Sequence, residues 1–228
     1  MINQVRQIAK DRGFVLYEEP YRLNIWGFRA NSEKPNSFDD ELHVFTNIAQ
    51  SGKPKWAYLV FKITTDPGTY WLKNPMNPQG TAILKAGQYV DVYAIDLHRG
   101  KYNALCQRNG KVTVIRDYDR DAILDFNNGR ETTGMYGINI HRANRIGDTL
   151  TVDKNSAGCQ VFKNANDFAF FMKLCEVHRS LYGNKFTYTL IDKRMEFRTK
   201  LKKITIGAVL VSILFGGYYL VTNDDKEV

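Results

Sequence analysis

A run of 20 uncharged residues near the C-terminus, ITIGAVLVSILFGGYYLVTN (204–223), limits what this chain can fold into. At about 1.5 Å per residue, a helix of this length spans about 30 Å, the thickness of the hydrocarbon core of a membrane. A helix packed on a soluble domain would have a polar face, and here only Thr205, Ser212 and Thr222 offer small polar side chains. The run therefore predicts a C-terminal transmembrane helix.

The segments on either side of this run differ in charge. Residues 191–203 (IDKRMEFRTKLKK) are strongly basic, whereas residues 224–228 (DDKEV) form a short acidic tail. Because basic segments resist translocation, the positive-inside rule predicts that residues 1–190, called the body below, stay on the cytoplasmic side of a membrane. Small residues spaced four apart within the run would let two such helices pack closely, which allows a homo-oligomer through this helix.

The body has the composition of a globular domain. The chain is 43% hydrophobic and 25% charged, which argues against disorder and repetitive structure. Three cysteines, an odd number, exclude a disulfide framework, and Cys175 falls on the apolar face of a predicted helix, where we expect it to be buried. The net charge is +8, but the body lacks a dense basic stripe with interleaved aromatic residues. We therefore expect no nucleic-acid partner.

Short strands separated by turn signals dominate the body. Helices are expected from the N-terminus to about Arg12 and from an N-cap near Asn166 to Tyr182. The dipeptide Asn109-Gly110 between two apolar segments predicts a β-hairpin. The fold class is therefore α+β with strands predominating. Strands are expected at residues 55–63, 88–95, 104–107, 111–115, 137–141, 158–162 and 186–191.

Cys159 and His141 are the main candidates for chemistry. A thiol becomes a nucleophile when a neighbouring base takes its proton or a cation lowers its pKa. A histidine on one strand and a cysteine at the start of the next can meet across a sheet. Ser156-Ala157-Gly158 precedes the cysteine, and such a small-residue turn lets backbone N–H groups approach a substrate oxygen as an oxyanion hole. On spacing alone, an inert thiol and a structural histidine stay open as the alternative.

The context of these two residues resembles a known family. His141 followed by Ser156-Ala157-Gly158-Cys159 is similar to the catalytic signature of L,D-transpeptidases, cysteine enzymes that cut and rejoin the stem peptides of peptidoglycan. With its SAGCQV motif, the chain looks like a divergent branch of the family that is common in phages and in bacteria carrying prophages. The resemblance covers about residues 20–190. The stretches that carry it are 65–72 (TDPGTYWL), 80–107 and 137–162.

The resemblance implies a β-rich, L,D-transpeptidase-like catalytic domain and gives roles to the residues that match. Cys159 would attack a stem-peptide carbonyl and form a thioester, with His141 as its general base and later acid. The backbone carbonyl of Arg142 would orient the His141 ring, and the N–H groups of Gly158 and Cys159 would hold the oxyanion. No cysteine and histidine spacing matches a zinc site and no phosphate-binding glycine loop is present, so we expect neither metal nor cofactor.

Two departures from the family pattern affect substrate binding. Ala157 stands where the family has a histidine, and Val161 stands where it has an arginine linked to substrate binding. Arg142 and Arg145 are the candidates to replace that arginine, and hydrolysis is as plausible as transfer. Four residues are expected to contact substrate: Asn139, Ser156, Arg145 and His98.

The sequence thus predicts a membrane-anchored, cell-wall-active cysteine enzyme whose partner is a peptidoglycan stem peptide. Two alternatives stay open: a degenerate relative that binds stem peptides or builds a virion or membrane complex, and a cytoplasmic cysteine hydrolase with another substrate. Peptidoglycan lies outside the membrane, whereas the charges place the body inside. A phage enzyme released at lysis or carried in a virion would reconcile the two, as would a span inserted against the charge rule.

Overall fold

The computed structural model describes residues 2–32, 34–127 and 129–193. Contacts divide the chain into two units, residues 1–192 and residues 193–228, and every element below belongs to the first. Among the residues described, no helix combines the length and the apolar character needed to cross a bilayer. The predicted transmembrane helix (204–223) and the acidic tail lie outside the described residues, as does the basic segment beyond Lys193.

The first unit is β-rich and mixes helices with strands, as the sequence predicts. Its helices are α1 (Ile2–Arg12), α2 (Thr69–Lys73), α3 (Ala165–Tyr182) and the short 3₁₀ helix η1 (Asp153–Asn155). Its strands are β1 (Asn24–Arg29), β2 (Asp40–Asn47), β3 (Trp56–Thr64), β4 (Thr81–Leu84), β5 (Gly87–His98), β6 (Tyr102–Gln107), β7 (Val112–Asp117), β8 (Arg130–Gly134), β9 (Ile140–Arg142), β10 (Gln160–Phe162) and β11 (Phe186–Asp192).

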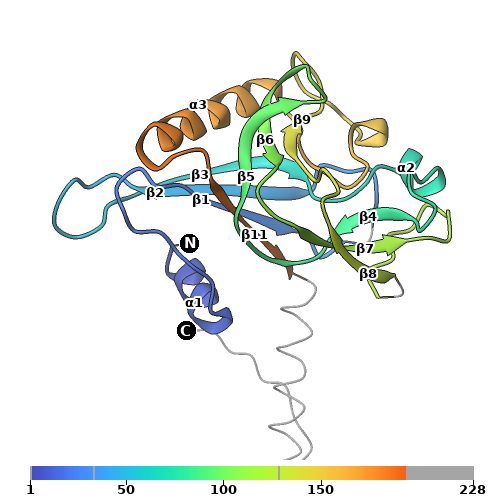
Figure 1. Ribbon diagram of the computed structural model, residues 1–228, viewed down its shortest axis with the longest axis horizontal. Helices are drawn as coiled ribbons and strands as arrows, with labels where there is room; N and C mark the ends of the chain where they lie inside the picture. Colours follow the sequence, from blue (N-terminus) through green and yellow to red (C-terminus); the bar gives the residue numbers. More distant parts are fainter. Residues whose placement is uncertain (1, 33, 128, 194–228) are drawn as a thin grey trace, which may run out of the picture. The chain divides into compact units, whose positions relative to one another are not determined.

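Eight of these strands close into a barrel in the order β1-β11-β5-β6-β9-β10-β3-β2, and β4-β7-β8 form a separate three-stranded sheet. Two neighbouring pairs in the barrel are parallel, β1 with β11 and β9 with β10, and the remaining pairs are antiparallel. In the parallel pair β9–β10, β9 carries His141 and β10 begins directly after Cys159. Figure 1 shows β9 above the small sheet of β4, β7 and β8 in this view.

Strand β1 is buried along its whole length because both of its faces are covered. Ile25 belongs to the main core, whereas Trp26 and Phe28 pack with Val5 and Ala9 of α1 on the other face. The sequence of a strand that is covered on both faces need not alternate between apolar and polar residues. This explains why the period-2 signal that identifies β5 does not identify β1.

Helix α3 follows the predicted segment closely, but its N-cap differs. The side chain of Asn164, not Asn166, accepts hydrogen bonds from the backbone N–H groups at the helix start, and the helix ends before Gly183 at φ 83°. One asparagine two residues earlier satisfies two free N–H donors at once, which is what an N-cap does. The predicted apolar face lies in the main core and includes Phe168, Phe171, Met172 and Cys175.

The hairpin predicted at Asn109-Gly110 is wrong. Strand β6 pairs with β5 and β9 in the barrel, whereas β7 pairs with β4 and β8 in the small sheet. A type I′ turn needs positive φ at both central residues, and neither Asn109 nor Gly110 has it. Instead the N–H groups of Arg108 and Asn109 donate to the carbonyl of Val92, so the chain leaves the barrel here and crosses to the second sheet.

Candidate active site

The turn before Cys159 is fixed by Ser156 and by the close approach of Gly158 to β4. The Ser156 hydroxyl donates to the Cys159 carbonyl (2.8 Å) and accepts from the Gly158 N–H (3.2 Å). Gly158 has φ 117°, and a Cβ built there would lie 2.3 Å from the carbonyl oxygen of Ala82. Only glycine fits such a position, because both the backbone angle and the space exclude a side chain. The turn thus holds the cysteine at the edge of the small sheet.

The Cys159 thiol is partly exposed and touches the chain just before β9. Its Sγ lies 3.4 Å from the Asn139 N–H, which donates to it, and 3.5 Å from the Gly137 carbonyl, to which the thiol proton can donate. Burial raises the pKa of Cys159, while the Asn139 N–H and the charge of Arg99 act in the opposite direction. At neutral pH the group is therefore a thiol and needs a base to become a nucleophile.

His141 lies on β9 with one ring nitrogen fixed by the backbone. Its Nδ1 is 2.8 Å from the carbonyl oxygen of Arg142, so Nδ1 carries the proton and Nε2 has a free lone pair. Burial and the neighbouring His98 lower the pKa of His141 to about 3, against the effect of the Arg142 carbonyl. The ring is therefore neutral at pH 7, and Nε2 is the nitrogen that can accept a proton. The carbonyl of Arg142 occupies the position that the sequence resemblance gives it.

A chain of hydrogen bonds fixes the tautomer of His98. The backbone N–H of Gln107 donates to Asn139 Oδ1 (2.9 Å), so the Asn139 amide nitrogen must face His98, 3.0 Å from its Nδ1. Nδ1 of His98 is then an acceptor, and its proton sits on Nε2. Burial lowers the pKa of His98 to about 4, and it stacks on His141 with ring centroids 4.1 Å apart. His98 can therefore donate a hydrogen bond from Nε2 but cannot act as the base in this state.

The register of β9 and β10 places the thiol and the imidazole on one face of the sheet. Val161 pairs with His141, and the Gln160 N–H donates to the Asn139 carbonyl, so Cys159 falls beside Asn139, two residues from His141. The structure therefore brings Cys159, Asn139 and His98 to one cleft and stacks His141 on His98, and among the described residues no hydrogen bond joins the thiol to the His141 imidazole.

The predicted oxyanion hole needs one correction. The N–H of Gly158 donates to the Ser156 hydroxyl, so it is already engaged. The backbone N–H of Cys159 has no hydrogen-bond partner within the part of the chain that the structure describes. Of the two predicted donors, only the Cys159 N–H is free to hold a substrate oxygen, and Ser156 acts through the turn rather than as a substrate contact.

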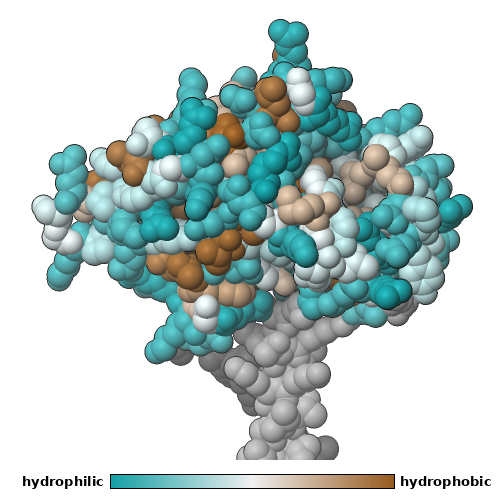
Figure 2. All heavy atoms as spheres, viewed as in Figure 1, coloured by the Kyte–Doolittle hydropathy of each residue, from teal (hydrophilic) through white to brown (hydrophobic). Residues whose placement is uncertain are grey.

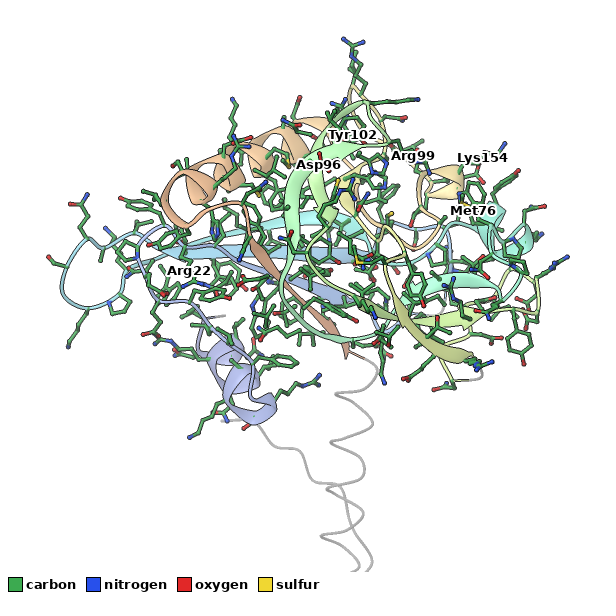
Figure 3. The ribbon with its side chains drawn as sticks, viewed as in Figure 1. Arg22, Met76, Asp96, Arg99, Tyr102 and Lys154 are labelled. Atoms are coloured by element: carbon green, nitrogen blue, oxygen red, sulfur yellow. The ribbon has the colours of Figure 1, made fainter. Side chains whose placement is uncertain are left out.

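Cys159 opens on a cleft of about 430 Å³ between the barrel and the small sheet. Figure 2 shows a face of the unit that is mostly hydrophilic, with small separate groups of hydrophobic residues. Scattered apolar residues are common on protein surfaces, so the cleft is the better indication of a ligand-binding site. Figure 3 labels two residues of the cleft: Met76 lies near α2, and Arg99 lies at the turn between β5 and β6. The cleft is lined by Met76, Asn77, Gly80, Thr81, Ala82, His98, Arg99, Arg116, Tyr136, Gly137, Ile138, Asn139, Ala157 and Cys159.

Two of the predicted substrate-binding arginines lie elsewhere. The side chains of Arg142 and Arg145 line a second pocket with Lys101 and Tyr102, and the Arg142 guanidinium stacks over the Tyr102 ring at 4.3 Å. Neither arginine lines the cleft at Cys159. The expectation that they replace the family's arginine is therefore wrong for this cleft. Val161 is fully buried, so an arginine at its position would have no access to solvent.

Three residues of the site have no role predicted from the sequence: Gln107 and Arg116 lie outside the motif, and Gln160 belongs to SAGCQV. Gln107 Oε1 accepts from three consecutive backbone N–H groups, of residues 136 to 138, at 3.1, 2.9 and 3.2 Å. Gln160 links the Gly158 carbonyl to the hydroxyl of a core tyrosine, and Arg116 of β7 lines the cleft. A glutamine at the end of a strand and an arginine within one are common in any sheet, so only the fold shows their part in the site.

Within residues 2–32, 34–127 and 129–193, no group of three histidine, cysteine or acidic side chains is arranged to hold a metal ion. Comparison of the chain with protein-family models, with curated proteins and with solved structures found no match. Function is therefore argued from the cleft and from the sequence motif.

Proposed function

We propose that the body is a cysteine enzyme that forms a thioester with the stem peptides of peptidoglycan, as an L,D-transpeptidase or an L,D-peptidase. One observation carries the proposal. Cys159 opens on a cleft, and the neighbouring strand presents, on the same face, an imidazole whose Nδ1 is fixed by the Arg142 carbonyl and whose Nε2 is free. The resemblance of the His141 and Ser156–Cys159 motifs supplies the substrate class.

The chemistry follows from the protonation states. As Cys159 Sγ bonds to the carbonyl carbon of the peptide, its proton passes to His141 Nε2, and the carbonyl oxygen takes the negative charge. The Cys159 N–H, and the Nε2–H of His98 where the substrate reaches it, are the donors available to stabilise that charge. The tetrahedral intermediate then breaks its C–N bond, and His141 returns the proton to the leaving amine.

The thioester that results has two fates. Water gives hydrolysis, and an amine gives transfer, with His141 accepting the proton of the incoming nucleophile in either case. Ala157 lines the cleft where the family has a histidine, which leaves more room beside the thiol. This room supports acceptance of either nucleophile, so the proposal includes both reactions.

A binding protein without turnover is the second candidate, and a specific observation favours it. Burial raises the pKa of Cys159, and the described residues contain no hydrogen bond between its thiol and His141. A degenerate relative would keep the cleft and its peptide affinity while losing the activated thiol. Such a protein would retain stem peptides or take part in a virion or membrane complex.

The proposal includes attachment to a membrane through residues 204–223, with the body on the cytoplasmic side and self-association through that helix allowed. A phage or prophage origin supports this arrangement, because lysis or carriage in a virion would bring the body to peptidoglycan. The charge of the basic segment before the helix is the support for the orientation.

The test is incubation of the full-length chain, in mild detergent, with purified disaccharide tetrapeptides, followed by mass spectrometry of protein and products. We expect an acyl adduct on the peptide that contains Cys159, together with a shortened or cross-linked muropeptide. Cys159→Ala should give neither. Retention of muropeptides without an adduct or a product would favour the binding protein. If muropeptides are neither retained nor processed, stem peptides are excluded as the substrate.

A further inference from the structure

Two buried arginines of this unit differ in how their charge is balanced. Arg29 is 1% exposed, and its guanidinium lies 2.8 Å from Asp66 and 3.5 Å from Asp192. It also donates to the carbonyls of Thr65 and Leu84. A buried cation is ordinarily stabilised in this way, by acceptors on several sides.

Arg116 is 4% exposed, and among the described residues it has no carboxylate partner. Its Nε donates to the Thr132 hydroxyl at 3.1 Å, and one Nη donates to the Gly80 carbonyl at 3.3 Å. A guanidinium has five N–H donors. The Tyr136 hydroxyl is a third acceptor beside these two, so two donors are left without an acceptor among the residues that the structure describes. No described carboxylate lies within ion-pair distance of it, and its guanidinium also lies over the Tyr136 ring, 4.5 Å from the centroid.

The unbalanced charge faces the cleft that contains Cys159. Arg116, Tyr136 and Gly80 line this cleft together with Cys159, and Arg99 adds a second positive charge. None of the described residues that line it is an aspartate or a glutamate. The described cleft wall therefore has no negative charge to balance Arg116, and we expect a negatively charged ligand to supply it. A carboxylate matches the two-pronged geometry of a guanidinium.

We propose that Arg116 is the carboxylate-binding residue of this cleft, so that the compound bound beside Cys159 is a peptide with a free carboxylate. The peptide nature of the ligand rests on the proposed function, whereas the carboxylate rests on Arg116 itself. Arg116 reaches the cleft from β7 of the small sheet, so the two sheets divide the work: the barrel supplies the thiol and imidazoles, and the small sheet supplies the anion site.

The experiment measures protection of Cys159, not turnover. The full-length chain in mild detergent is treated with iodoacetamide, and alkylation of Cys159 is followed by peptide mapping. N-acetyl-Ala-Ala with a free C-terminal carboxylate is compared with the same peptide as its C-terminal amide. We expect the acid to protect at a concentration roughly 10- to 100-fold lower than the amide, since a charge-assisted pair contributes about 1.5–3 kcal/mol.

Three variants locate the effect. Arg116→Gln should raise the half-protecting concentration of the acid to that of the amide, and Arg116→Lys should keep part of the preference. Arg145→Gln is the matched control, because it removes one positive charge outside the cleft and should leave the preference unchanged. Thermal unfolding of each variant establishes that it is folded, and if Arg116→Gln does not fold, the comparison of acid with amide on the wild type decides.

Equal protection by acid and amide in the wild type would overturn the proposal, as would protection by neither. Loss of the preference in Arg145→Gln but not in Arg116→Gln would assign the carboxylate to the other pocket and overturn it as well. Because the readout needs no turnover, a carboxylate preference without processing of muropeptides refutes only the enzyme, and turnover without a preference refutes only the role of Arg116.

Discussion

The unit contains two pairs of a cysteine and a histidine, and they differ in what their imidazoles are bonded to. Cys175 and His178 lie one turn apart on α3, and burial raises the pKa of that thiol and lowers the pKa of that imidazole. The same directions hold for Cys159, which lines the cleft, and for His141 on β9. His178 accepts from the Leu23 N–H at Nδ1 and donates to the Lys185 carbonyl from Nε2.

The two pairs therefore differ in two respects: whether the imidazole keeps a nitrogen that can accept a proton, and whether the thiol is accessible to solvent. Both nitrogens of His178 are held by the backbone, whereas His141 uses Nδ1 alone and keeps Nε2 as a lone-pair donor. Cys175 is fully buried in the main core, whereas Cys159 is partly exposed and lines a cleft. The two shifted pKa values do not separate a catalytic pair from a structural one, but the unused acceptor and the open cleft do.

The largest expected difference between the two pairs is in thiol alkylation. In the folded protein, iodoacetamide should modify Cys159 about 10³- to 10⁶-fold faster than Cys175, because Cys175 reacts only in the small unfolded fraction. Peptide mapping after partial alkylation measures the ratio. Cys106, whose pKa is raised by burial to about 11, serves as a second protected thiol. Modification of Cys175 at a rate near that of Cys159 would remove the distinction on which the site rests.

Removal of each imidazole gives the next effect. His141→Ala should lower the rate of muropeptide processing about 10²- to 10⁴-fold, the usual contribution of a general base, and should change the pH dependence of Cys159 alkylation. His178→Ala should leave both nearly unchanged in the folded protein while lowering its stability, because it removes two backbone hydrogen bonds. An identical alkylation profile in His141→Ala and the wild type would mean that His141 and Cys159 do not communicate.

Both cysteines, and the histidine beside Cys159, can be predicted from local sequence patterns. Cys159, His141 and the Arg142 carbonyl follow from a local motif, because β9 and β10 lie on either side of one loop and pair directly. Cys175 follows from helical periodicity. Local patterns are sufficient wherever the contacts are between elements close in sequence.

The same local patterns fail where the two sheets meet. The Asn109-Gly110 signal cannot tell a hairpin from a crossing between sheets, because strand pairing depends on long-range contacts. Arg116 reaches the cleft across that crossing, so no motif near Cys159 could indicate it. The Gly158 N–H is predicted as a donor to substrate, but the neighbouring Ser156 hydroxyl takes it, a competition that spacing does not reveal.

Substitution of Gln107, which holds residues 136–138 at the cleft, should have a smaller effect, on the free energy of unfolding. Gln107→Leu removes the acceptor of three backbone N–H groups before β9, of which that of Ile138 is buried, so we expect the free energy of unfolding to fall by about 2–4 kcal/mol. Cys175→Ala, which removes one sulfur from an apolar environment, should cost about 1 kcal/mol. Denaturant unfolding measures both. A loss for Gln107→Leu no larger than that for Cys175→Ala would mean that the loop is held by other contacts.

The pH dependence of stability should give the smallest effect. The pKa of His141 is about 3 in the folded state against 6.5 for the free side chain, so the unfolded state binds more protons between these two values. The free energy of unfolding that depends on neutral His141 is fully present above pH 6.5 and is lost as the pH falls toward 3. At pH 5 this loss amounts to about 2 kcal/mol.

His141→Asn should therefore flatten the curve of unfolding free energy between pH 7 and pH 5 by about 1–2 kcal/mol. His178→Asn should flatten it less. Burial lowers the pKa of both histidines and a backbone carbonyl raises both, but His98 and Arg99 lower the pKa of His141 further, whereas the effect of Arg22 on His178 is opposed by Asp91. Chemical unfolding at the two pH values measures both slopes. If the two variants flatten the curve equally, the surroundings of His141 oppose protonation no more than those of His178 in α3, and the assignment of His141 as a neutral base loses its electrostatic support.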